Sequence, residues 1–415
     1  MLVNQDGKKI KYLSTLINQK ANDADNHKIY IGLENVEPKT SRLLINENAP
    51  TEVDGQSNLF YKHNVLFGKL RPYLAKGFTA DFEGRCSGEF LVLQTSDKIS
   101  PVFLNYLMLS DHFIDDVNSS TYGAKMPRAS WDYIGNIKVD VPTIEIQKSI
   151  VDFLNKRTHN IDLLISKKQK LIDLLQEKRQ AIIDEVVTKG LDPNAPMKDS
   201  GIEGLGTVPA KWEVKIIKRI THEHKQGYYG SDGYVDEGIK LARITDIDDR
   251  YNVSFENMPF VNLNKKEEKA FKIDEGDFLF VRSGATIGKF GIVRNPEKSV
   301  FASYLIRFKF KNVNTEFLKY ALSSSYFRNN LFSTLHGGAN TNINAENIKE
   351  QIVCLPPIDE QRIINANLDE TCNKLNKLID LTEKQIVKLI EYRQSLISEA
   401  VTGIDVIQYG EEVVQ

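Results

Sequence analysis

The sequence has little cysteine, no surplus of charge of either sign and no long apolar run. Its three cysteines, Cys86, Cys354 and Cys372, are scattered and odd in number, which disfavours a disulfide framework and favours a reducing compartment. No stretch approaches the roughly 18 uninterrupted apolar residues of a membrane span, and the first residues lack the apolar core of a signal peptide. We therefore expect a cytoplasmic protein with no membrane partner.

The charges nearly cancel, because 54 Lys and Arg face 56 Asp and Glu, for a net charge of -2. A polyanion such as DNA would therefore have to meet a local cluster of cations rather than the whole surface. Hydrophobic residues make up 41% and charged residues 27%, which is typical of soluble globular chains. At roughly 100 to 200 residues per domain, 415 residues predict two or three domains.

An internal repeat organises the chain. Residues 139–188 align without a gap to residues 353–402, at a constant offset of 214, and 18 of the 50 aligned positions are identical. The identities include Gln147/Gln361 and Arg179/Arg393. Such self-similarity indicates a duplicated structural unit.

Each copy of the repeat predicts a long helix, because a proline precedes a stretch that contains neither Gly nor Pro. Apolar residues recur in it at the 3-4 spacing of a coiled-coil seam. The predicted seam residues are Leu154, Ile161, Ile165, Ile172, Leu175, Ile182 and Val186, and Leu368, Leu375, Ile379, Ile386, Leu389, Leu396 and Ala400. Four seam positions are polar, namely Lys168, Arg179, Thr382 and Arg393. The duplication favours two helices that pack antiparallel as a spacer; an ordinary core or oligomerisation helix is the alternative.

A segment of mixed character precedes each predicted helix, with short runs rich in aromatic and β-branched residues such as GEFLVLQT and ASYLIRFKF. The predicted class is α+β, with two mixed globular domains and two long antiparallel helices. The expected boundaries are a globular unit at 1–138, a helix at 139–190, a linker at 191–210, a globular unit at 211–352, a helix at 353–404 and a tail at 405–415.

Cations and amides in the two globular units are the candidate contacts for a polyanion. They stand among glycines and aromatics at the ends of predicted strands and in polar loops, where donors can reach phosphates or base edges. The predicted DNA-binding residues are Lys69, Arg71, Lys76, Lys125 and Arg128 in the first unit, and Arg243, Arg282, Ser283, Lys289, Arg294, Asn340 and Asn342 in the second. Each of them could instead be a solvated surface residue or, for asparagine, a turn residue.

Catalytic motifs are weak by comparison. His222 and His224 form a pair without a third metal ligand nearby, so a metal site is disfavoured. Asp246, Asp248 and Asp249 could bind Mg²⁺ beside a phosphate, but a solvated acidic turn is the favoured interpretation. The chain has no GxGxxG, HExxH or GxSxG motif, so neither a catalytic residue nor a cofactor site is expected in it.

Several motifs together resemble the specificity subunits of type I restriction-modification systems. They are VPTIEIQ and LPPIDEQ at the helix starts, KRQAIIDEVVTKGLD and YRQSLISEAVTGID at the helix ends, the connector KGLDPNAPMKDSGIEGLGTVPAKWEV, and LFVRSGATIGK. The resemblance covers nearly the whole chain. One departure is that VPAKWEV precedes the second unit, whereas the first begins with KKIKYLSTLI and lacks the tryptophan.

The resemblance implies a non-catalytic DNA reader with two target recognition domains, each reading one half of a split, asymmetric site in double-stranded DNA. It also implies two modification subunits that methylate adenine with S-adenosylmethionine, and restriction subunits that use ATP and Mg²⁺, all assembled on this chain. Two alternatives stay open from the residues alone. One is a self-contained nuclease or methyltransferase that uses Asp246 and Asp248, and the other is a coiled-coil scaffold with no role on DNA.

Overall fold

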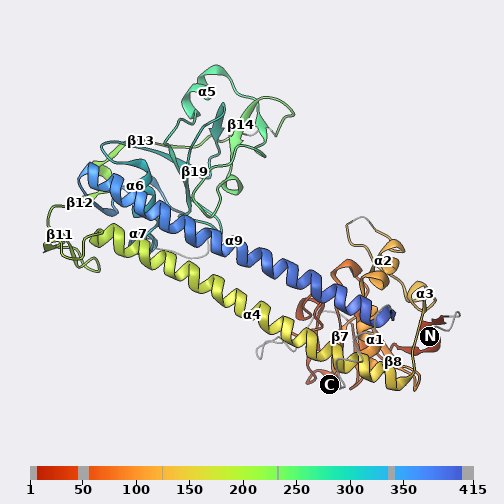
Figure 1. Ribbon diagram of the computed structural model, residues 1–415. Helices are drawn as coiled ribbons and strands as arrows, with labels where there is room; N and C mark the ends of the chain where they lie inside the picture. The colour runs from red at the N-terminus through yellow and green to blue at the C-terminus, as the bar shows by residue number, and fades with distance from the viewer. Residues whose placement is uncertain (1–6, 45–55, 124, 231–232, 335–341, 404–415) are drawn as a thin grey trace. The chain divides into compact units, whose positions relative to one another are not determined.

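The structure is a computed structural model that describes residues 7–44, 56–123, 125–230, 233–334 and 342–403. The chain divides into two compact units. The first combines Met1–Lys170 with Thr382–Gln415, and the second is Leu171–Leu381. Both boundaries fall inside long helices, so each unit contains one globular domain and a segment of both helices (Figure 1).

The two long helices are α4, Ile144–Lys189, and α9, Ile358–Thr402. At about 1.5 Å per residue each is about 68 Å long. Every predicted seam residue is buried or half-buried, as expected for a coiled-coil stripe. Each helix begins five residues after its predicted start, because the residues before it form a short strand and an irregular segment that contains proline.

Contacts within each unit run antiparallel. In the first unit Lys168 Nζ donates to Gln385 Oε1 at 2.7 Å, and Arg393 Nε donates to Asp162 Oδ1 at 2.9 Å. In the second unit the last turns of α4 pack against the first turns of α9, where they share an apolar cluster. Three of the four polar seam residues therefore have a defined role: Lys168 and Arg393 bond across the pair, and Arg179 Nη1 donates to an asparagine of α9 at 2.6 Å.

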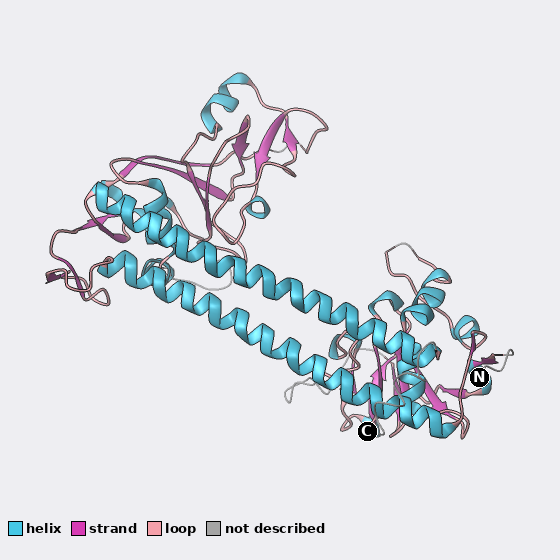
Figure 2. Cartoon of the chain, in the orientation of Figure 1, coloured by secondary structure: helices cyan, strands magenta, loops and turns pink. Residues whose placement is uncertain are grey.

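The first domain contains two sheets of more than two strands, and its strands are magenta in Figure 2. One is antiparallel in the order β2-β8-β5-β6, and the other has the order β3-β7-β4, with β3 and β7 parallel. The strands are β2 Ser14–Ile17, β3 Tyr30–Ile31, β4 Ser57–Phe60, β5 Val65–Gly68, β6 Gly77–Thr79, β7 Gly84–Ser87 and β8 Phe90–Thr95. The helices are α1 Pro101–Met108, α2 Asp111–Ser119 and α3 Trp131–Ile134, and β1 Lys8–Lys9 pairs with β9 Lys138–Val139. β4 and β5 are buried along their whole length, and the apolar run Val65–Phe67 of β5 lies in the core.

The second domain repeats this order. Its antiparallel sheet is β13-β19-β16-β17, and its small sheet is β15-β14-β18, with β14 and β18 parallel. The strands are β12 Glu213–Ile216, β13 Thr221–Gln226, β14 Ile239–Ala242, β15 Phe260–Val261, β16 Phe278–Val281, β17 Phe290–Ile292, β18 Ser299–Phe301, β19 Leu305–Phe310 and β20 Ile352–Leu355. The helices are α5 Lys265–Phe271, α6 Thr315–Ser323, α7 Ser325–Ser333 and α8 Ala345–Lys349. The predicted α+β class, with two mixed domains and two long helices, is confirmed.

The two small sheets differ in one respect. In the first domain the third strand, β4, is added to β7, whereas in the second the third strand, β15, is added to β14, the opposite edge of the parallel pair. The second domain also contains α5, whereas the described residues between β3 and β5 of the first domain include no α-helix. The repeat is therefore a shared framework with local changes around the parallel pair.

A glutamine near the start of each long helix binds the first helix of its domain. Gln147 Oε1 accepts a hydrogen bond from Ser100 N at 2.7 Å, and Gln361 Oε1 accepts one from Asn314 N at 2.8 Å. Ser100 and Asn314 are the N-cap residues of α1 and α6. Both glutamines are buried. Their identity in the repeat therefore follows from one structural role, which is to orient an otherwise unpaired helix terminus.

A second glutamine, near the end of the other long helix, binds the C-terminal end of α1 or α6. Gln394 Nε2 donates to Leu109 O at the end of α1, at 2.5 Å, and Gln180 Nε2 donates to Ser323 O at the end of α6, at 3.1 Å. Each domain is thus bound by the first turns of one long helix and the last turns of the other. A domain and both helix segments consequently form one packed unit.

The connector between the halves forms a short hairpin of β10 Met197–Asp199 and β11 Thr207–Pro209. Most of its residues are exposed, as a linker requires. Trp212, which follows the hairpin, is buried, and its Nε1 donates to Glu360 Oε1 of α9 at 2.9 Å. The repeat counterpart of Glu360 is Ile146, so the first copy lacks this carboxylate.

Candidate nucleic-acid interface

Two loops of the first domain meet and bring four predicted cations onto one surface. The loop after β5 carries Lys69 and Arg71, and the loop before α3 carries Lys125 and Arg128. The backbones are joined by hydrogen bonds from residue 129 N to residue 69 O at 2.9 Å and from residue 71 N to residue 127 O at 2.7 Å. Residues separated by more than 50 positions in sequence therefore form one cationic surface.

These cations differ in how they are engaged. Arg128 donates to both carboxylate oxygens of Glu89, with Nη2 to Oε1 at 3.0 Å, and this pairing raises the pKa of Arg128. Within the described residues, the side chains of Lys69, Arg71 and Lys125 have no hydrogen bond or ion pair. Their ammonium and guanidinium groups are available to an external anion.

Lys76, the fifth cation predicted in the first domain, is half-buried and donates to Leu33 O at 2.7 Å. Its bond supports the turn between β5 and β6. Arg71 in the same turn has a φ of 51°, the left-handed region that costs a non-glycine residue roughly 1 kcal/mol. Strain of this kind is concentrated at functional loops, and here it fixes the direction in which the Arg71 side chain leaves the backbone.

The corresponding loop of the second domain begins with Arg282 and Ser283, directly after β16. Arg282 O accepts from Ile343 N at 2.8 Å, as Lys69 O accepts from Ala129 N at 2.9 Å. Arg282 N donates to Tyr304 O at 2.9 Å, and Lys69 N donates to a carbonyl at the same distance. Lys69 and Arg282 therefore occupy equivalent positions. Among the described residues the Arg282 and Ser283 side chains likewise have no hydrogen-bond partner.

Three other predicted cations of the second domain are bound to acidic side chains. Arg243 Nη2 donates to Asp246 Oδ1 at 3.0 Å, Lys289 Nζ donates to an aspartate at 2.7 Å, and Arg294 Nε donates to a glutamate at 3.0 Å. The partner of Lys289 is Asp249, whose pKa is lowered by the Lys289 hydrogen bond and charge. Breaking such a pair to bind DNA costs more than using an unpaired cation.

The predicted amide contacts lie in the loop before α8. Asn342 is exposed there, whereas Asn340 lies outside the described residues. Asn344 accepts from Asn347 N at 2.9 Å and so caps α8. The loop is attached to the Arg282 loop through the Ile343 N bond, so Asn342 and Arg282 belong to one surface.

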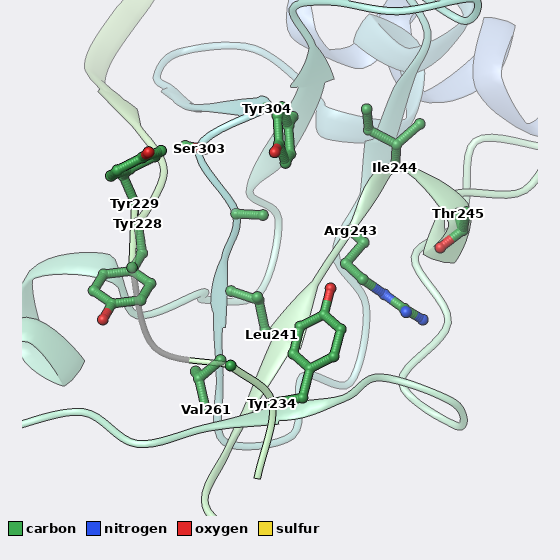
Figure 3. A pocket seen from close by; sticks show the side chains of 13 residues that line it. Tyr228, Tyr229, Tyr234, Leu241, Arg243, Ile244, Thr245, Val261, Ser303 and Tyr304 are labelled. Atoms are coloured by element: carbon green, nitrogen blue, oxygen red, sulfur yellow. The ribbon is translucent and has the colours of Figure 1, made fainter.

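A groove lined by tyrosines lies beside these loops in the second domain (Figure 3). Its volume is about 440 Å³, and three of its tyrosines, Tyr229, Tyr234 and Tyr304, are exposed by 83%, 65% and 57%. Of the predicted residues only Arg243 lines it. Sequence reasoning missed the tyrosines, although GYYGSDGY, an aromatic and glycine-rich run between two strands, is the pattern that could have indicated them.

The acidic residues considered for catalysis are engaged in structural bonds. Asp246 is buried and binds Arg243, and Asp248 Oδ1 accepts from Arg250 N and Asn252 N at 2.8 and 2.7 Å. No group of three or more His, Cys, Asp or Glu that could hold a metal occurs in the described part of the chain. Within that part, no helix is both long and apolar enough to span a membrane.

Two repeated α+β domains, each with an exposed cationic loop and each bound to both long helices, define a two-domain DNA-recognition protein. The chain belongs to the family described as the type I restriction modification DNA specificity domain, whose sequence profile matches residues 8–173 and 213–391. It is thus a specificity subunit of a type I restriction-modification system, and its partners are DNA and that complex. The enzyme interpretation based on Asp246 and Asp248 is wrong, as is that of a scaffold without a role on DNA. The family implies no cofactor in this chain.

Individual relatives agree with this assignment. The MjaVIII specificity subunit of Methanocaldococcus jannaschii is 25% identical over 332 residues, which covers 77% of this chain and 74% of the relative. The EcoDI specificity subunit of Escherichia coli is 30% identical over 92 residues, or 22% of this chain and 20% of the relative. A chain from a structural study of complex assembly and conformational transition of the type I R-M system has a similar fold. Its TM-score is 0.72 at 15% identity, and the alignment covers 97% of this chain and 99% of that one.

Proposed function

We propose that this specificity subunit reads a bipartite, asymmetric target in double-stranded DNA, with one half-site for each domain. The observation that carries the proposal is the equivalence of Lys69 and Arg282. Each opens the loop after the central strand of its domain, uses the same pair of backbone hydrogen bonds and carries a half-buried cation that has no ion pair among the described residues. Phosphate contacts from such cations position a protein on DNA, and neighbouring side chains then read base edges.

The asymmetry of the target follows from differences around these two cations. In the first domain Lys69 is accompanied by the unpaired Arg71 and Lys125, and in the second domain Arg282 is accompanied by Ser283 and Asn342. Different donors select different bases, so the two half-sites have different sequences. The lengths of α4 and α9 set the number of base pairs between them.

Two modification subunits and the restriction subunits are the proposed protein partners, and the modification subunits bind along α4 and α9. Apolar side chains remain exposed on both helices. In the first unit they include Leu163, Leu164, Val387, Ile390 and Tyr392, and in the second Leu171, Leu174, Ile363 and Leu381. Exposed apolar residues repeated along a helix are typical of a protein interface. Replacing Leu163 and Leu164 together by Asp should abolish co-purification with the modification subunit, and intact co-purification would contradict this docking site.

The proposed division of chemistry assigns S-adenosylmethionine to the modification subunits, which methylate adenine, and ATP and Mg²⁺ to the restriction subunits. This chain supplies the sequence specificity for DNA and contributes no catalytic group. We expect the assembly to act in the cytoplasm, where it would meet its DNA target and partner enzymes.

Methylation mapping in cells that express the chain with its modification subunit tests the proposal. The expected result is a split motif with methylated adenine that appears only when the chain is present. Lys69→Ala should weaken methylation through the first half-site, and Arg282→Ala through the second. A methylation pattern that does not depend on the chain would overturn the proposal.

A further inference from the structure

The tyrosine groove of the second domain has the properties of a site that reads one base. It is formed by the segment after β13, the first residues after β14 and the turn between β18 and β19 (Figure 3). Its volume of about 440 Å³ is in the range of ligand sites and suits the protruding edge of a base pair. Large side chains that stay exposed in a hollow commonly meet a partner.

Three tyrosine rings form the exposed walls of the groove. Tyr229, Tyr234 and Tyr304 are exposed by 83%, 65% and 57%, and all three line the same hollow. A tyrosine ring offers a rigid apolar face for a base or a thymine methyl group and a hydroxyl for a phosphate. The walls therefore match the mixed apolar and polar surface of DNA.

Arg243 is the positioned donor of the groove. Its Nε and Nη2 donate to Asp246 at 3.2 and 3.0 Å, and its Nη2 also donates to Asn257 O at 3.0 Å. Hydrogen bonding to Asp246 raises the pKa of Arg243, so the side chain is a fixed cation. Figure 3 shows the ring of Tyr234 beside it.

The Asp246 carboxylate also decides what Arg243 can recognise. Because the pair is neutral overall, the guanidinium has little net attraction for a phosphate. The Tyr234 hydroxyl also hydrogen-bonds to Arg243. The Nη1 group, which neither Asp246 nor Asn257 uses, keeps directional N–H donors on the groove side. Such donors favour a neutral acceptor, and O6 and N7 of guanine are the acceptors that arginine binds most often in the major groove.

Two further observations locate the groove in the interface. Tyr304, one of its walls, accepts the backbone hydrogen bond of Arg282, so the groove adjoins the cationic loop. The first domain has Gly32 in the place of Arg243: Gly32 N donates to Asn35 Oδ1 at 2.8 Å, as Arg243 N donates to Asp246 Oδ2 at 2.8 Å. The donor is therefore particular to the second domain.

We propose that this groove receives the major-groove edge of a guanine in the second half-site, with Arg243 as the specificity-determining donor and Tyr229 and Tyr304 as the walls. The proposal rests on the DNA-reading function proposed above. It adds that the second domain recognises a guanine and that Arg243 is the residue that does so.

The test uses the full chain assembled with its modification subunits and DNA duplexes that carry each base pair at each position of the second half-site. Arg243→Lys keeps the charge beside Asp246 but loses the planar fork. It should reduce the preference for guanine at one position about tenfold, measured as the ratio of methylation kcat/KM values. Penalties for mismatches in the first half-site should stay unchanged.

Tyr229→Ala and Tyr304→Ala provide a second measurement that does not depend on the buried Asp246, because both rings are largely exposed. Each should lower kcat/KM on the full target about fivefold and leave first half-site penalties unaltered. Tyr12→Ala, in the first domain, is the matched control, since Tyr12 is exposed by 67% and lies outside the groove.

The outcomes separate the two proposals. Guanine discrimination that falls at one position in Arg243→Lys supports the groove. A wild-type complex with a bipartite motif whose second half-site is read equally well by the Arg243 and tyrosine variants would overturn the groove and leave the DNA-reading function intact. An equal, salt-dependent loss at every position would mean a phosphate contact and also overturn guanine reading. A wild-type complex without sequence preference would remove both proposals.

Discussion

The first and second domains hold their helices with the same hydrogen bonds at positions 214 residues apart, whereas the loops after their central strands carry different side chains. Gln147 and Gln361 bind the starts of α1 and α6 in the same way. Beside Lys69 lie further unpaired cations, but beside Arg282 lies a groove of tyrosines with an ion-paired arginine. The hydrogen bonds to the long helices are the same in both domains because equivalent helix ends need the same partners. The side chains of the loops differ between the domains because these loops face DNA and do not contribute to the framework.

Exchange of a whole reading surface should have the largest effect. Replacing residues 1–138 by the corresponding unit of another specificity subunit should change the first half-site completely and leave the second half-site and the spacing unaltered. The physical reason is that the bonds from α4 and α9 to the first domain involve framework positions, such as Gln147 and Gln394, and not the loop of Lys69. Methylation mapping is the measurement. A change in both half-sites would show that the domains do not read independently.

Sequence patterns predicted the framework better than the reading surface, for a physical reason. The helices, their seam and the two mixed domains follow from the repeat, since apolar spacing and proline positions determine burial locally. The bonds of Gln147 and Gln180 are visible only after folding, because their partners, Ser100 and Ser323, lie 47 and 143 positions away. The hairpin in the linker also escaped prediction, because each of its strands is only three residues long and β10 is exposed throughout, so neither strand carries an apolar alternation.

Which cations stay unpaired could not be predicted either. Lys289 and Arg282 lie in one sequence run, yet Lys289 meets Asp249 and Arg282 meets no acidic side chain among the described residues. The difference depends on the path of the segment between β14 and β15, which brings Asp249 to Lys289. The groove depends on the same kind of distant approach, here between Tyr229 and Tyr304.

Arg393 and Arg179, identical in the repeat, should differ strongly when each is replaced by Ala. Arg393 is buried and donates to Lys39 O at 2.7 Å, to Thr40 O at 3.1 Å and to Asp162. Its loss leaves several polar groups unsatisfied and should cost about 2 to 4 kcal/mol of unfolding free energy. Arg179 is half-buried and donates a hydrogen bond to an asparagine of α9, so a loss of about 1 kcal/mol is expected.

Urea unfolding of the two variants measures this difference. Gln176→Ala is the matched control, because Gln176 is an exposed residue of α4, and it should change the unfolding free energy by less than about 0.5 kcal/mol. Equal losses for Arg393→Ala and Arg179→Ala would mean that the loop at residues 39–40 does not depend on α9.

The two domains should differ in the pH dependence of their stability, because the side chain that accepts a hydrogen bond in the turn before the central strand is titratable only in the second domain. Asn64 Oδ1 accepts from Tyr61 N at 2.8 Å in the first domain, and Asp277 Oδ2 accepts from Asp274 N at 2.9 Å in the second. Asp277 is only 2% exposed, and burial raises its pKa to about 6. A folded pKa above the unfolded value of about 4 gives a stabilising contribution that is complete below pH 4. It is lost as the pH rises through about 6.

Asp277→Asn introduces the amide that the first domain has at this position and should remove the pH-dependent loss of stability. The free energy of unfolding of the variant should exceed that of the wild type by about 2 kcal/mol at pH 8 and by little at pH 4. Unfolding by urea from pH 4 to pH 8 is the measurement, and Asn64→Asp is the reciprocal variant, which should acquire the loss. A wild-type stability that rises between pH 5 and pH 7, relative to Asp277→Asn, would contradict the role of burial.

The smallest expected effect compares an unpaired with a paired cation. Lys125→Ala removes an unpaired ammonium group of the first domain, whereas Lys289→Ala removes one that Asp249 already neutralises. If Lys125 contacts a phosphate, its loss should weaken DNA binding by the assembled complex about equally on all sequences and reduce the salt slope by about 0.9. Lys289→Ala should reduce the slope by less, because its charge already has a partner and few counterions are released there. Binding measured between 50 and 200 mM salt distinguishes the two variants. Equal slopes would mean that DNA displaces Asp249 from Lys289, and the second domain would then read DNA with more cations than its unbound structure exposes.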